Sequence, residues 1–475
     1  MGSIDVIIIV LYFMVIALVG VIGAKRAKTS EDYIVASRNL GFPMFFACLA
    51  ALSLGGAATI GTAKLGYQFG ISGMWFVFSQ GIGFVILSIF LAKKIFELKV
   101  LTIGEMLENR FSVEARLISS LVSAVYTIML TVTQIIGIGT ILNVWLQWDI
   151  TLSIIVSGGI VLFYTVLGGM WSVTLTDIVQ FTIMTIGIFF IMLPMSLEKA
   201  GGWSQLQAAL PTKYFDVSVM GGMDILKSLL LYTLGIVVGQ DVWQRVFTAR
   251  SLKISRLGMI AAGGYSFLYA VTLSIIGMCA FVALPSIDNP QNAFASMAIY
   301  TLPAGVLGIV LASVLSALMS TSSGTLLASS TLIVNDIIKR LFVKDMSEKQ
   351  FLTTSRVTTF MIGIFSIICA IWIQDILVAL DIAFAVLSGA LFFPIILGFF
   401  WKRVTSKAVF YSILISTIVI IISLALKGTA SFSPILYGLI TSVITIVIVS
   451  YFTISNNQTE NVTNEEGKDG ENASI

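Results

Sequence analysis

The stretch Phe42–Gly70, FPMFFACLAALSLGGAATIGTAKLGYQFG, decides the fold expected for this chain. It is long and apolar enough to cross a bilayer. Yet Gly55 and Gly56 lie at its middle, flanked by small residues, and Lys64 lies in its second half. Irregular backbone at membrane depth is tolerated only where it is buried in protein or lines a cavity. A hydrophobic segment interrupted by glycine therefore predicts the central binding site of a membrane transporter.

Apolar segments recur along almost the whole chain. The 475 residues are 57% hydrophobic and 11% charged, whereas a soluble domain carries about 25% charged residues. The short alternating segments of a transmembrane β-barrel are not found. The expected fold class is therefore an all-α polytopic membrane protein. Thirteen spans are predicted, near residues 5–24, 42–68, 73–94, 118–145, 150–168, 174–196, 223–243, 257–284, 303–336, 353–373, 376–400, 405–426 and 432–453.

The positive charges predict how the chain is oriented, because cytoplasmic loops carry an excess of Lys and Arg. Most of the 27 Lys and Arg residues fall in alternate loops, and only Lys199, Lys213 and Lys427 fall in the others. We therefore expect a multi-pass protein of the cell membrane with its N-terminus outside and its C-terminus in the cytoplasm. The polar tail, residues 454–475, has no apolar periodicity and is expected to be disordered.

The ninth predicted span is unusually rich in hydroxyl groups. Residues 317–331 read ALMSTSSGTLLASST, and Ser316, Ser320 and Ser323 are spaced so that they share one helical face. Polar groups inside a span are costly and are functional candidates by default. Their oxygen atoms suit a small hard cation such as sodium, and hydrogen bonding between helices is the alternative.

The interrupted second span also has two interpretations. Unwinding at Gly55 and Gly56 would free carbonyl groups near Ala51 and Leu54 to coordinate sodium. Close packing of helices through small residues is the alternative. The seventh span contains glycines in the same way, within residues 231–245. Broken helices at matching positions in two halves are typical of a transporter built from inverted repeats.

Three charged residues within predicted spans are candidates for function. Asp177 is either part of a site or a cap at a helix N-terminus, and Asp381 has Lys64 as a candidate partner. Lys64 either extends to the outer interface or binds a carboxylate of the substrate. Contacts to the substrate are predicted for Ser53, Gly55, Gly56, Thr59, Lys64, Gln134, Gln240 and Asp381.

Several motifs resemble those of the sodium:solute symporter family, which includes sodium/proline, sodium/pantothenate and sodium/glucose transporters. The clearest is YTVLGGMWS at residues 164–172, followed by TDIVQF at 176–181. The resemblance covers about residues 5–450. The other motifs are SEDYIVASRNLG at 30–41, LTIGEMLENRF at 101–111, WQRVFTARS at 243–251 and SALMSTSSGTLLASSTLIVNDI at 316–337.

This resemblance implies a leucine-transporter-type core of two inverted five-helix repeats, formed by spans 2–6 and 7–11. The implied division is an N-terminal helix and loop at 1–41, a first repeat at 42–196, an outer connection at 197–222, a second repeat at 223–400, two further helices at 401–453 and the tail at 454–475.

The resemblance also implies a sodium site. Its ligands are the carbonyl groups of Ala51, Leu54 and Ala317 and the hydroxyl groups of Ser320 and Thr321. Some family members are similar in having a second sodium site at the position of Asp177. Here Ser323 keeps one hydroxyl of that site, but Gly324 lacks the next. Asp177 and Ser323 therefore form either a second site or a group that tunes the first.

The resemblance does not carry over a substrate. Residues 62–66 replace the Gly-Pro-Gly-like run of pantothenate and monocarboxylate carriers, and Ser53 stands where the proline symporter has aspartate. The expected function is sodium-coupled import of a small organic solute, a carboxylate or an amino acid, by alternating access. The alternatives on the same fold are a proton-coupled carrier, an uncoupled carrier and a solute sensor.

Other function classes are not expected. The chain has no histidine, and its three cysteines are dispersed among apolar segments. A metal-dependent enzyme would need clustered ligands of these kinds, so we expect no enzyme. The expected partners are the solute, co-transported sodium ions and membrane lipid, without nucleic acid.

Overall fold

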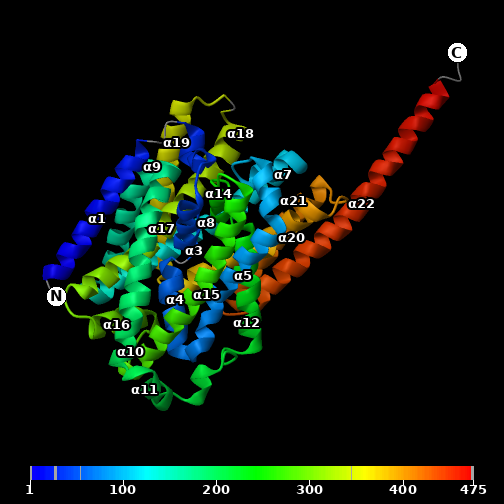
Figure 1. The fold of residues 1–475 in the computed structure, drawn as a ribbon. Helices are drawn as coiled ribbons and strands as arrows, with labels where there is room; N and C mark the ends of the chain where they lie inside the picture. Colours follow the sequence, from blue (N-terminus) through cyan, green and yellow to red (C-terminus); the bar gives the residue numbers. More distant parts are fainter. Residues whose placement is uncertain (1–2, 26–28, 54, 344, 472–475) are drawn as a thin grey trace.

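The computed structural model describes residues 3–25, 29–53, 55–343 and 345–471, which form one bundle of helices (Figure 1). Its description of side chains omits residues 3, 24, 30, 53, 164, 167–169 and 454–471. Helix accounts for 87% of the structure, and an isolated bridge pairs Leu40 with Ala249. The all-α fold class is therefore confirmed.

The bounds of the elements follow the apolar segments closely. The longer helices and the pieces of the broken ones are α1 (Ser3–Ala24), α3 (Phe42–Ser53), α4 (Gly56–Phe69), α5 (Trp75–Ile86), α8 (Val113–Leu146), α9 (Ile150–Thr185), α10 (Leu193–Lys199), α12 (Gly222–Ser228), α13 (Leu234–Val238), α14 (Gln240–Val246), α15 (Leu252–Ala283), α17 (Val306–Thr331), α19 (Glu348–Ile373), α20 (Ile376–Phe400), α21 (Ser406–Lys427) and α22 (Ser433–Glu471).

Short helices and irregular turns join these elements. They are α2 (Ser30–Val35), α6 (Ala92–Leu98), α7 (Ile103–Arg110), α11 (Gly202–Ala209), α16 (Ala293–Thr301) and α18 (Lys339–Leu341), the 3₁₀ turns η1 (Ala36–Arg38), η2 (Gly70–Met74), η5 (Thr212–Phe215) and η7 (Pro290–Asn292), and the π-helical turns η3 (Leu87–Leu91), η4 (Ile186–Met192), η6 (Leu229–Thr233) and η8 (Leu332–Ile338).

Thirteen separate spans are not confirmed. Within the described residues, ten helices are long and apolar enough to cross a membrane, or eleven if one bent pair counts as a span. Element α9 extends from Ile150 to Thr185, but the apolar helices described within and after it are separate, Ile150–Phe163 and Met170–Lys199. The predicted break between spans at 168–174 agrees with this division.

The first broken helix consists of α3 and α4, which are separated next to Gly55. Gly55 precedes α4 with φ −52° and ψ 174°, so its backbone is extended rather than helical. A Cβ atom at Gly55 would lie 2.1 Å from the hydroxyl oxygen of Thr321 on α17. Glycine is therefore required here by the close approach of α17. At the far end of α4, Gly70 has φ +64°, a conformation that glycine adopts without strain.

The second broken helix is interrupted at Gly239. Its extended backbone, with φ −71° and ψ 124°, ends α13 and begins α14. The segments Gly222–Val238 and Gln240–Val246 meet at an angle of 44°. The seventh span is thus broken near the predicted position.

Helix α17 lies at the centre of the bundle, and α1 lies at its edge (Figure 1). The most apolar window of the span that contains α17 is 83% buried, against 22% for α1. The hydroxyl-rich stretch of α17 is therefore surrounded by other helices. These neighbours are α1, α3, α4, α8, α9, α14 and α19.

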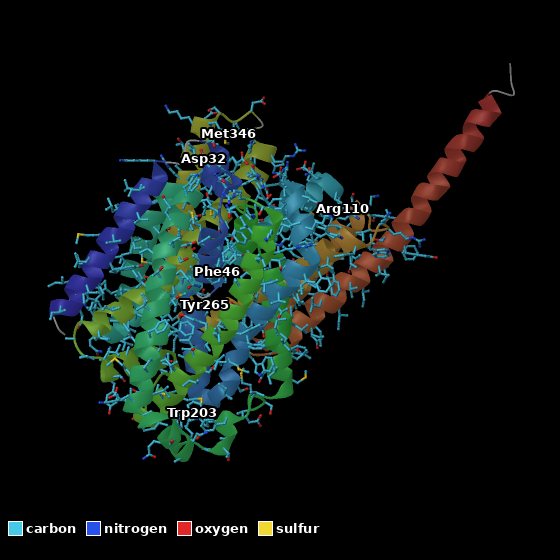
Figure 2. The ribbon with its side chains drawn as sticks, in the orientation of Figure 1. Asp32, Phe46, Arg110, Trp203, Tyr265 and Met346 are labelled. Atoms are coloured by element: carbon cyan, nitrogen blue, oxygen red, sulfur yellow. The ribbon has the colours of Figure 1, made fainter. Side chains whose placement is uncertain are left out.

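The two ends of the bundle carry different residues. Asp32, Arg110 and Met346 lie at one end and Trp203 lies at the other, which we call the Trp203 end (Figure 2). Helix α22 continues to Glu471 and projects away from the bundle (Figure 1), where the sequence predicts a disordered tail. Residues 454–471 contain no proline, so the backbone can continue the helix that precedes them.

Candidate functional site

The two broken helices meet at a small cavity inside the bundle, which we call the central cavity. Gly55, Ala57 and Ala58 of the first broken helix line it, and Asp241 and Val242 of the second line it from another side. Its volume is about 30 Å³. Residues of α5, α8, α17 and α20 complete its walls. In this conformation the cavity is small and has space for about one water molecule.

A group of oxygen atoms surrounds Thr321 next to the central cavity. The Thr321 hydroxyl oxygen lies 3.4 Å from the carbonyl oxygen of Ala51, 2.8 Å from that of Leu52 and 3.2 Å from that of Ala317. We call these four oxygens the Thr321 oxygen cluster. Three of its residues are predicted sodium ligands, whereas Leu52 is not. Carbonyl and hydroxyl oxygens are the donors that hard cations prefer, so the cluster fits a sodium ion.

Ser320 faces a different partner from Thr321. Its hydroxyl donates a hydrogen bond to Oδ1 of Asp177. Asp177 is fully buried and lies well inside α9, so the interpretation of Asp177 as a helix cap is wrong. Ser323 donates to the carbonyl oxygen of Ser320 at 3.1 Å, and it does not contact Asp177 directly in the described hydrogen bonds.

A buried arginine that the prediction omitted neutralises Asp177. Nη2 of Arg245 lies 3.3 Å from Oδ2 of Asp177, and both side chains are at most 1% exposed. The thiol of Cys48 lies 3.0 Å from the same carboxylate oxygen. The signal in the sequence is an ionisable residue at the end of a broken span, which is a functional candidate by default.

Asp241 and Tyr126 are two further residues of the central cavity that the prediction omitted. Asp241 is 3% exposed and Tyr126 is fully buried. Neither Oδ1 of Asp241 nor the Tyr126 hydroxyl makes a hydrogen bond of normal geometry within the described residues, although the two groups lie near each other and interact. A buried polar group without a partner is uncommon and calls for an explanation, such as an absent ligand.

Gln134 also lines the central cavity, as predicted for a residue in contact with the substrate. Its Oε1 atom accepts a hydrogen bond of 3.4 Å from the backbone amide of Ala57, in the first turn of α4. Its Nε2 atom donates to the hydroxyl of Thr133 at 2.9 Å. The amide group of Gln134 is therefore held in one orientation at the start of α4.

Other predicted substrate residues are engaged elsewhere. The Thr59 hydroxyl lies 2.6 Å from that of Tyr269 on α15. A Cβ atom at Gly56 would lie 1.8 Å from Cγ of Leu318, so this glycine packs closely against α17. Neither Thr59 nor Gly56 is among the residues that line the central cavity.

Gln240 joins the second broken helix to the segment before α7. Its Oε1 atom accepts from the backbone amide of Ile103 at 2.9 Å, and its Nε2 atom donates to the carbonyl oxygen of Leu101 at 3.4 Å. Gln240 is therefore separate from the central cavity in this conformation. Leu54 and the side chain of Ser53, the remaining predicted residues, lie outside the described part of the chain.

The predicted pairing of Lys64 with Asp381 is wrong. Nζ of Lys64 lies 3.0 Å from Oδ2 of Asp375, the residue that caps α20. Asp381, further along α20, pairs with Lys227 at 2.7 Å and accepts a hydrogen bond of 2.6 Å from Tyr232. The sequence shows which residues are charged but not which helices face each other. It therefore cannot distinguish Asp375 from Asp381 as the partner of Lys64.

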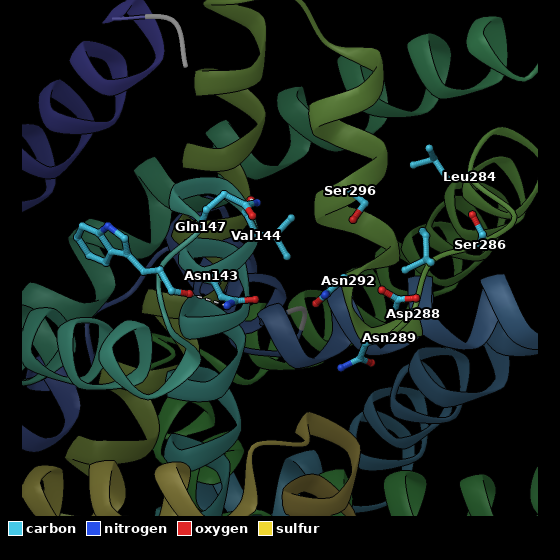
Figure 3. A pocket seen from close by; sticks show the side chains of 11 residues that line it. Asn143, Val144, Gln147, Leu284, Ser286, Asp288, Asn289, Asn292 and Ser296 are labelled. Carbon is cyan, nitrogen blue, oxygen red and sulfur yellow. Dashed lines mark hydrogen bonds between the residues drawn. The ribbon is translucent and has the colours of Figure 1, made fainter.

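A larger pocket of about 460 Å³ lies apart from the central cavity (Figure 3). Its polar walls come from the connection between α8 and α9 and from the connection between α15 and α16. Within it, Nδ2 of Asn143 donates to the carbonyl oxygen of Trp148 at 2.7 Å, the dashed line in Figure 3. The pocket shares no lining residue with the central cavity, so it is not part of the candidate site.

Similar proteins of known structure share this architecture. The structure of a Na⁺-coupled sialic acid symporter, in a substrate-bound outward-open state, matches with a TM-score of 0.82 and 23% identity over 95% of this chain and 98% of that one. Mhp1, a nucleobase-cation-symport-1 family transporter in a closed conformation with bromovinylhydantoin bound, matches with a TM-score of 0.59 and 16% identity over 89% and 95%. The chain therefore has the leucine-transporter-type fold.

The proteins with similar sequences are transporters, and the similarity extends along almost their whole length. The high-affinity proline transporter PutP of Bacillus subtilis is 25% identical over 457 residues, which cover 92% of this chain and 95% of the relative. A sodium/proline symporter of Staphylococcus aureus is 26% identical over 470 residues, or 94% and 91%. The family model described as "Sodium:solute symporter family" matches residues 33–416. The chain therefore belongs to the sodium:solute symporter family and is a sodium-coupled symporter of a small solute.

Proposed function

We propose that this symporter imports a small solute that carries a protonated amine, with an amino acid as the best-supported class. The observation that carries the proposal is Asp241, a buried carboxylate in the wall of the central cavity. One of its oxygens has no hydrogen-bond partner within the described residues. A buried carboxylate oxygen without a hydrogen bond is costly, and a cationic group on the solute would offset that cost.

The cation that is nearest in sequence on the same helix acts on Asp241 through its charge but makes its hydrogen bond to another carboxylate. Arg245 follows Asp241 by one helical turn, but its hydrogen bond goes to Asp177. The hydroxyl of Tyr126 is the other polar group without a hydrogen bond of normal geometry at this wall, within the described residues. An ammonium group can donate to both the Asp241 carboxylate and the Tyr126 oxygen, because it has several N–H groups and no acceptor.

The opposite wall of the central cavity favours negative charge. Helix α4 begins there, and Gly55, Ala57 and Ala58 line the cavity. The N-terminus of a helix carries partial positive charge and free amide donors, which together bind carboxylates. A solute with an ammonium group at Asp241 and a carboxylate at the start of α4 would satisfy both walls. The relatives named as proline transporters agree with this class.

Thr321 supplies a physical route from sodium to solute. It belongs to the Thr321 oxygen cluster and also lines the central cavity. We propose that sodium binds this cluster through Ala51, Ala317 and Thr321, with the carbonyl group of Leu54 as a further predicted ligand. It would thereby fix the break of the first helix in the shape that the solute binds. A coupling free energy of about 1–3 kcal/mol is typical of such linkage.

We further propose that the two repeats, residues 42–196 and 223–400, rock against each other to give alternating access. The Trp203 end is assigned to the outside of the cell membrane. The opposite end, which carries Arg110 (Figure 2), is assigned to the cytoplasm, since cytoplasmic loops are the basic ones. This orientation places the N-terminus outside and the C-terminus inside.

Thermal stability of the purified protein would test the solute class. Amino acids, simple amines, carboxylates and sugars are screened in sodium buffer and in choline buffer of equal ionic strength. We expect an amino acid to raise the melting temperature only in sodium. Asp241→Asn should lose that response and keep the smaller shift caused by sodium alone. Stabilisation by a sugar or by a carboxylate without an amine would contradict the proposed class.

A further inference from the structure

A buried arginine lies beside the Thr321 oxygen cluster and is not used by the proposed transport of the solute. Arg245 on α14 and Asp177 on α9 form an ion pair with 3.3 Å between Nη2 and Oδ2. Ser320, which donates to the same carboxylate, immediately precedes Thr321 on α17. The resident positive charge of Arg245 is therefore close to the position proposed for sodium.

Gly324 makes the room that the guanidinium group occupies. A Cβ atom at Gly324 would lie 2.5 Å from both Nη1 and Nη2 of Arg245 and 2.9 Å from its Cζ. Any side chain at this position, including the hydroxyl of serine, would displace the guanidinium group. Glycine in the middle of a helix is destabilising relative to alanine, so its presence in α17 is explained by the space that Arg245 takes.

Both oxygens of Asp177 are occupied. Ser320 donates to Oδ1, and Arg245 and Cys48 contact Oδ2. A second monovalent cation at Asp177 would have to share the carboxylate with the guanidinium group. Like charges in such proximity repel strongly where water is excluded, so the arginine and a second sodium ion exclude each other at this carboxylate.

The contacts of Arg245 suit a resident charge better than a structural brace. Its Nε and Nη1 atoms are buried and make no hydrogen bond within the described residues. An arginine that only joins two helices normally uses its fork of donors fully. Here the guanidinium group supplies charge to Asp177 and to Asp241 and lies beside the Cys48 thiol, while two of its three nitrogens make no hydrogen bond within the described residues.

We propose that Arg245 is a resident cation that replaces a second sodium ion beside Asp177, so that this transporter binds and couples one sodium ion per solute molecule. The proposal rests on the sodium-coupled function above and specifies its stoichiometry. Arg245 is a positioning residue, because it acts through the charge of Asp177 and does not touch the proposed sodium ligands in the described contacts.

The test counts sodium ions directly, with ²²Na⁺ alone as the probe. The full chain is placed in lipid nanodiscs, and equilibrium binding gives the number of ions per protein and the Hill coefficient. We expect one ion and a Hill coefficient of one for the unaltered protein. Arg245→Gln combined with Gly324→Ser, which removes the charge and adds a hydroxyl, should bind two ions. Arg245→Lys keeps the charge and should bind one.

Arg250→Gln is the matched control, because Arg250 is exposed and follows the same helix. It should leave the count at one. Two ions bound to the unaltered protein would overturn the proposal without any variant, which covers the case in which the double variant fails to fold. A folded double variant that binds a single ion would also overturn it. No bound ion at all would instead contradict the sodium site on which the proposed function depends.

Discussion

Lys64 and Asp375 form an ion pair, 3.0 Å between Nζ and Oδ2, that joins the first broken helix to the beginning of α20. The side chains are 15% and 38% exposed, so the pair is partly solvated and lies outside the central cavity. This partner explains the lysine within an apolar segment. It also argues against Lys64 as the residue that binds the carboxylate of the solute.

Exchanging the charges of Lys64 and Asp375 would show whether Lys64 acts in the ion pair or binds the carboxylate of the solute. Lys64→Asp alone places two carboxylates together and should slow uptake strongly, because like charges then hold α4 and α20 apart. Combining it with Asp375→Lys restores the pair in reverse and should recover part of the uptake, because lysine cannot replace Asp375 as the cap of α20. Lys93→Asp is a control, since Lys93 is 64% exposed in a surface pair. Failure of the double exchange to recover uptake, with protein present in the membrane, would favour a direct role in solute binding.

Thr321 should control the apparent affinity for sodium. Thr321→Ala removes one oxygen of the Thr321 oxygen cluster and leaves the carbonyl groups of Ala51, Leu52 and Ala317 without their shared neighbour. Losing one polar partner costs about 1–3 kcal/mol, so the sodium concentration for half-maximal uptake should rise about tenfold or more.

Thr321→Ser retains the hydroxyl and is the matched control for that substitution. It should shift the sodium dependence much less than Thr321→Ala. Ser320→Ala should also raise the sodium requirement, here through the lost hydrogen bond to Asp177. Sodium curves that coincide for all three variants and the unaltered protein would refute the assignment of the site to this part of α17.

Gly56 should be intolerant of even one added methyl group. The Cβ of Gly56→Ala would lie 1.8 Å from Cγ of Leu318 and 1.9 Å from its Cδ2. Overpacking of this kind costs about 1–3 kcal/mol and should lower the melting temperature. Adding Leu318→Ala opens the space and should recover part of the loss. Gly159→Ala, where no atom lies within 4 Å, should be neutral or stabilising.

Glu108 should make the free energy of unfolding depend on pH. Burial raises the pKa of Glu108, but hydrogen bonds from Arg116 and Arg340 outweigh it and leave the pKa below the ordinary value of 4.5. The unfolded chain therefore binds the proton first as pH falls, and the stabilisation by Glu108 is complete above pH 4.5. It is lost as pH falls through the lowered pKa.

Melting temperatures across a pH series would measure this effect. Glu108→Gln should be less stable than the unaltered protein near neutral pH, by about 1 kcal/mol as for partly exposed pairs. The difference should disappear in acid, where Glu108 is protonated in both states. Glu97→Gln is the control, since Glu97 is 61% exposed. A difference that persists unchanged below the lowered pKa would show that the carboxylate charge is not its source.

The sequence carries some features of the site and not others, for physical reasons. Glycine and hydroxyl patterns mark the break near Ala51 and the hydroxyl-rich segment that contains Thr321, because a break and a polar face are properties of single segments, whereas Ala317 was predicted from the family resemblance. The partners of Lys64 and Gln240 depend on which helices pack together, and no pattern within one segment contains that information. The predicted pairing of Lys64 with Asp381 was accordingly wrong, and the predicted roles of Lys64 and Gln240 in binding the solute stay predictions.

The close contact between Arg245 and Gly324 is another feature that a pattern within one segment cannot show. A glycine that makes room for a guanidinium group looks, in sequence, like a site that has lost a hydroxyl. The predicted number of thirteen spans is not confirmed, because ten helices, or eleven with the bent pair, are long and apolar enough to span within the described residues.

The first turns of α20 hold two ion pairs, Asp375 with Lys64 and Asp381 with Lys227. Any motion that draws α20 away from α4 and α12 must break both pairs and expose four charges. Dissolved ions of any kind screen such charges, with a Debye length of about 8 Å at physiological ionic strength. High ionic strength around these two pairs should therefore favour the conformation in which α20 has moved away from α4 and α12. This effect does not depend on sodium being transported.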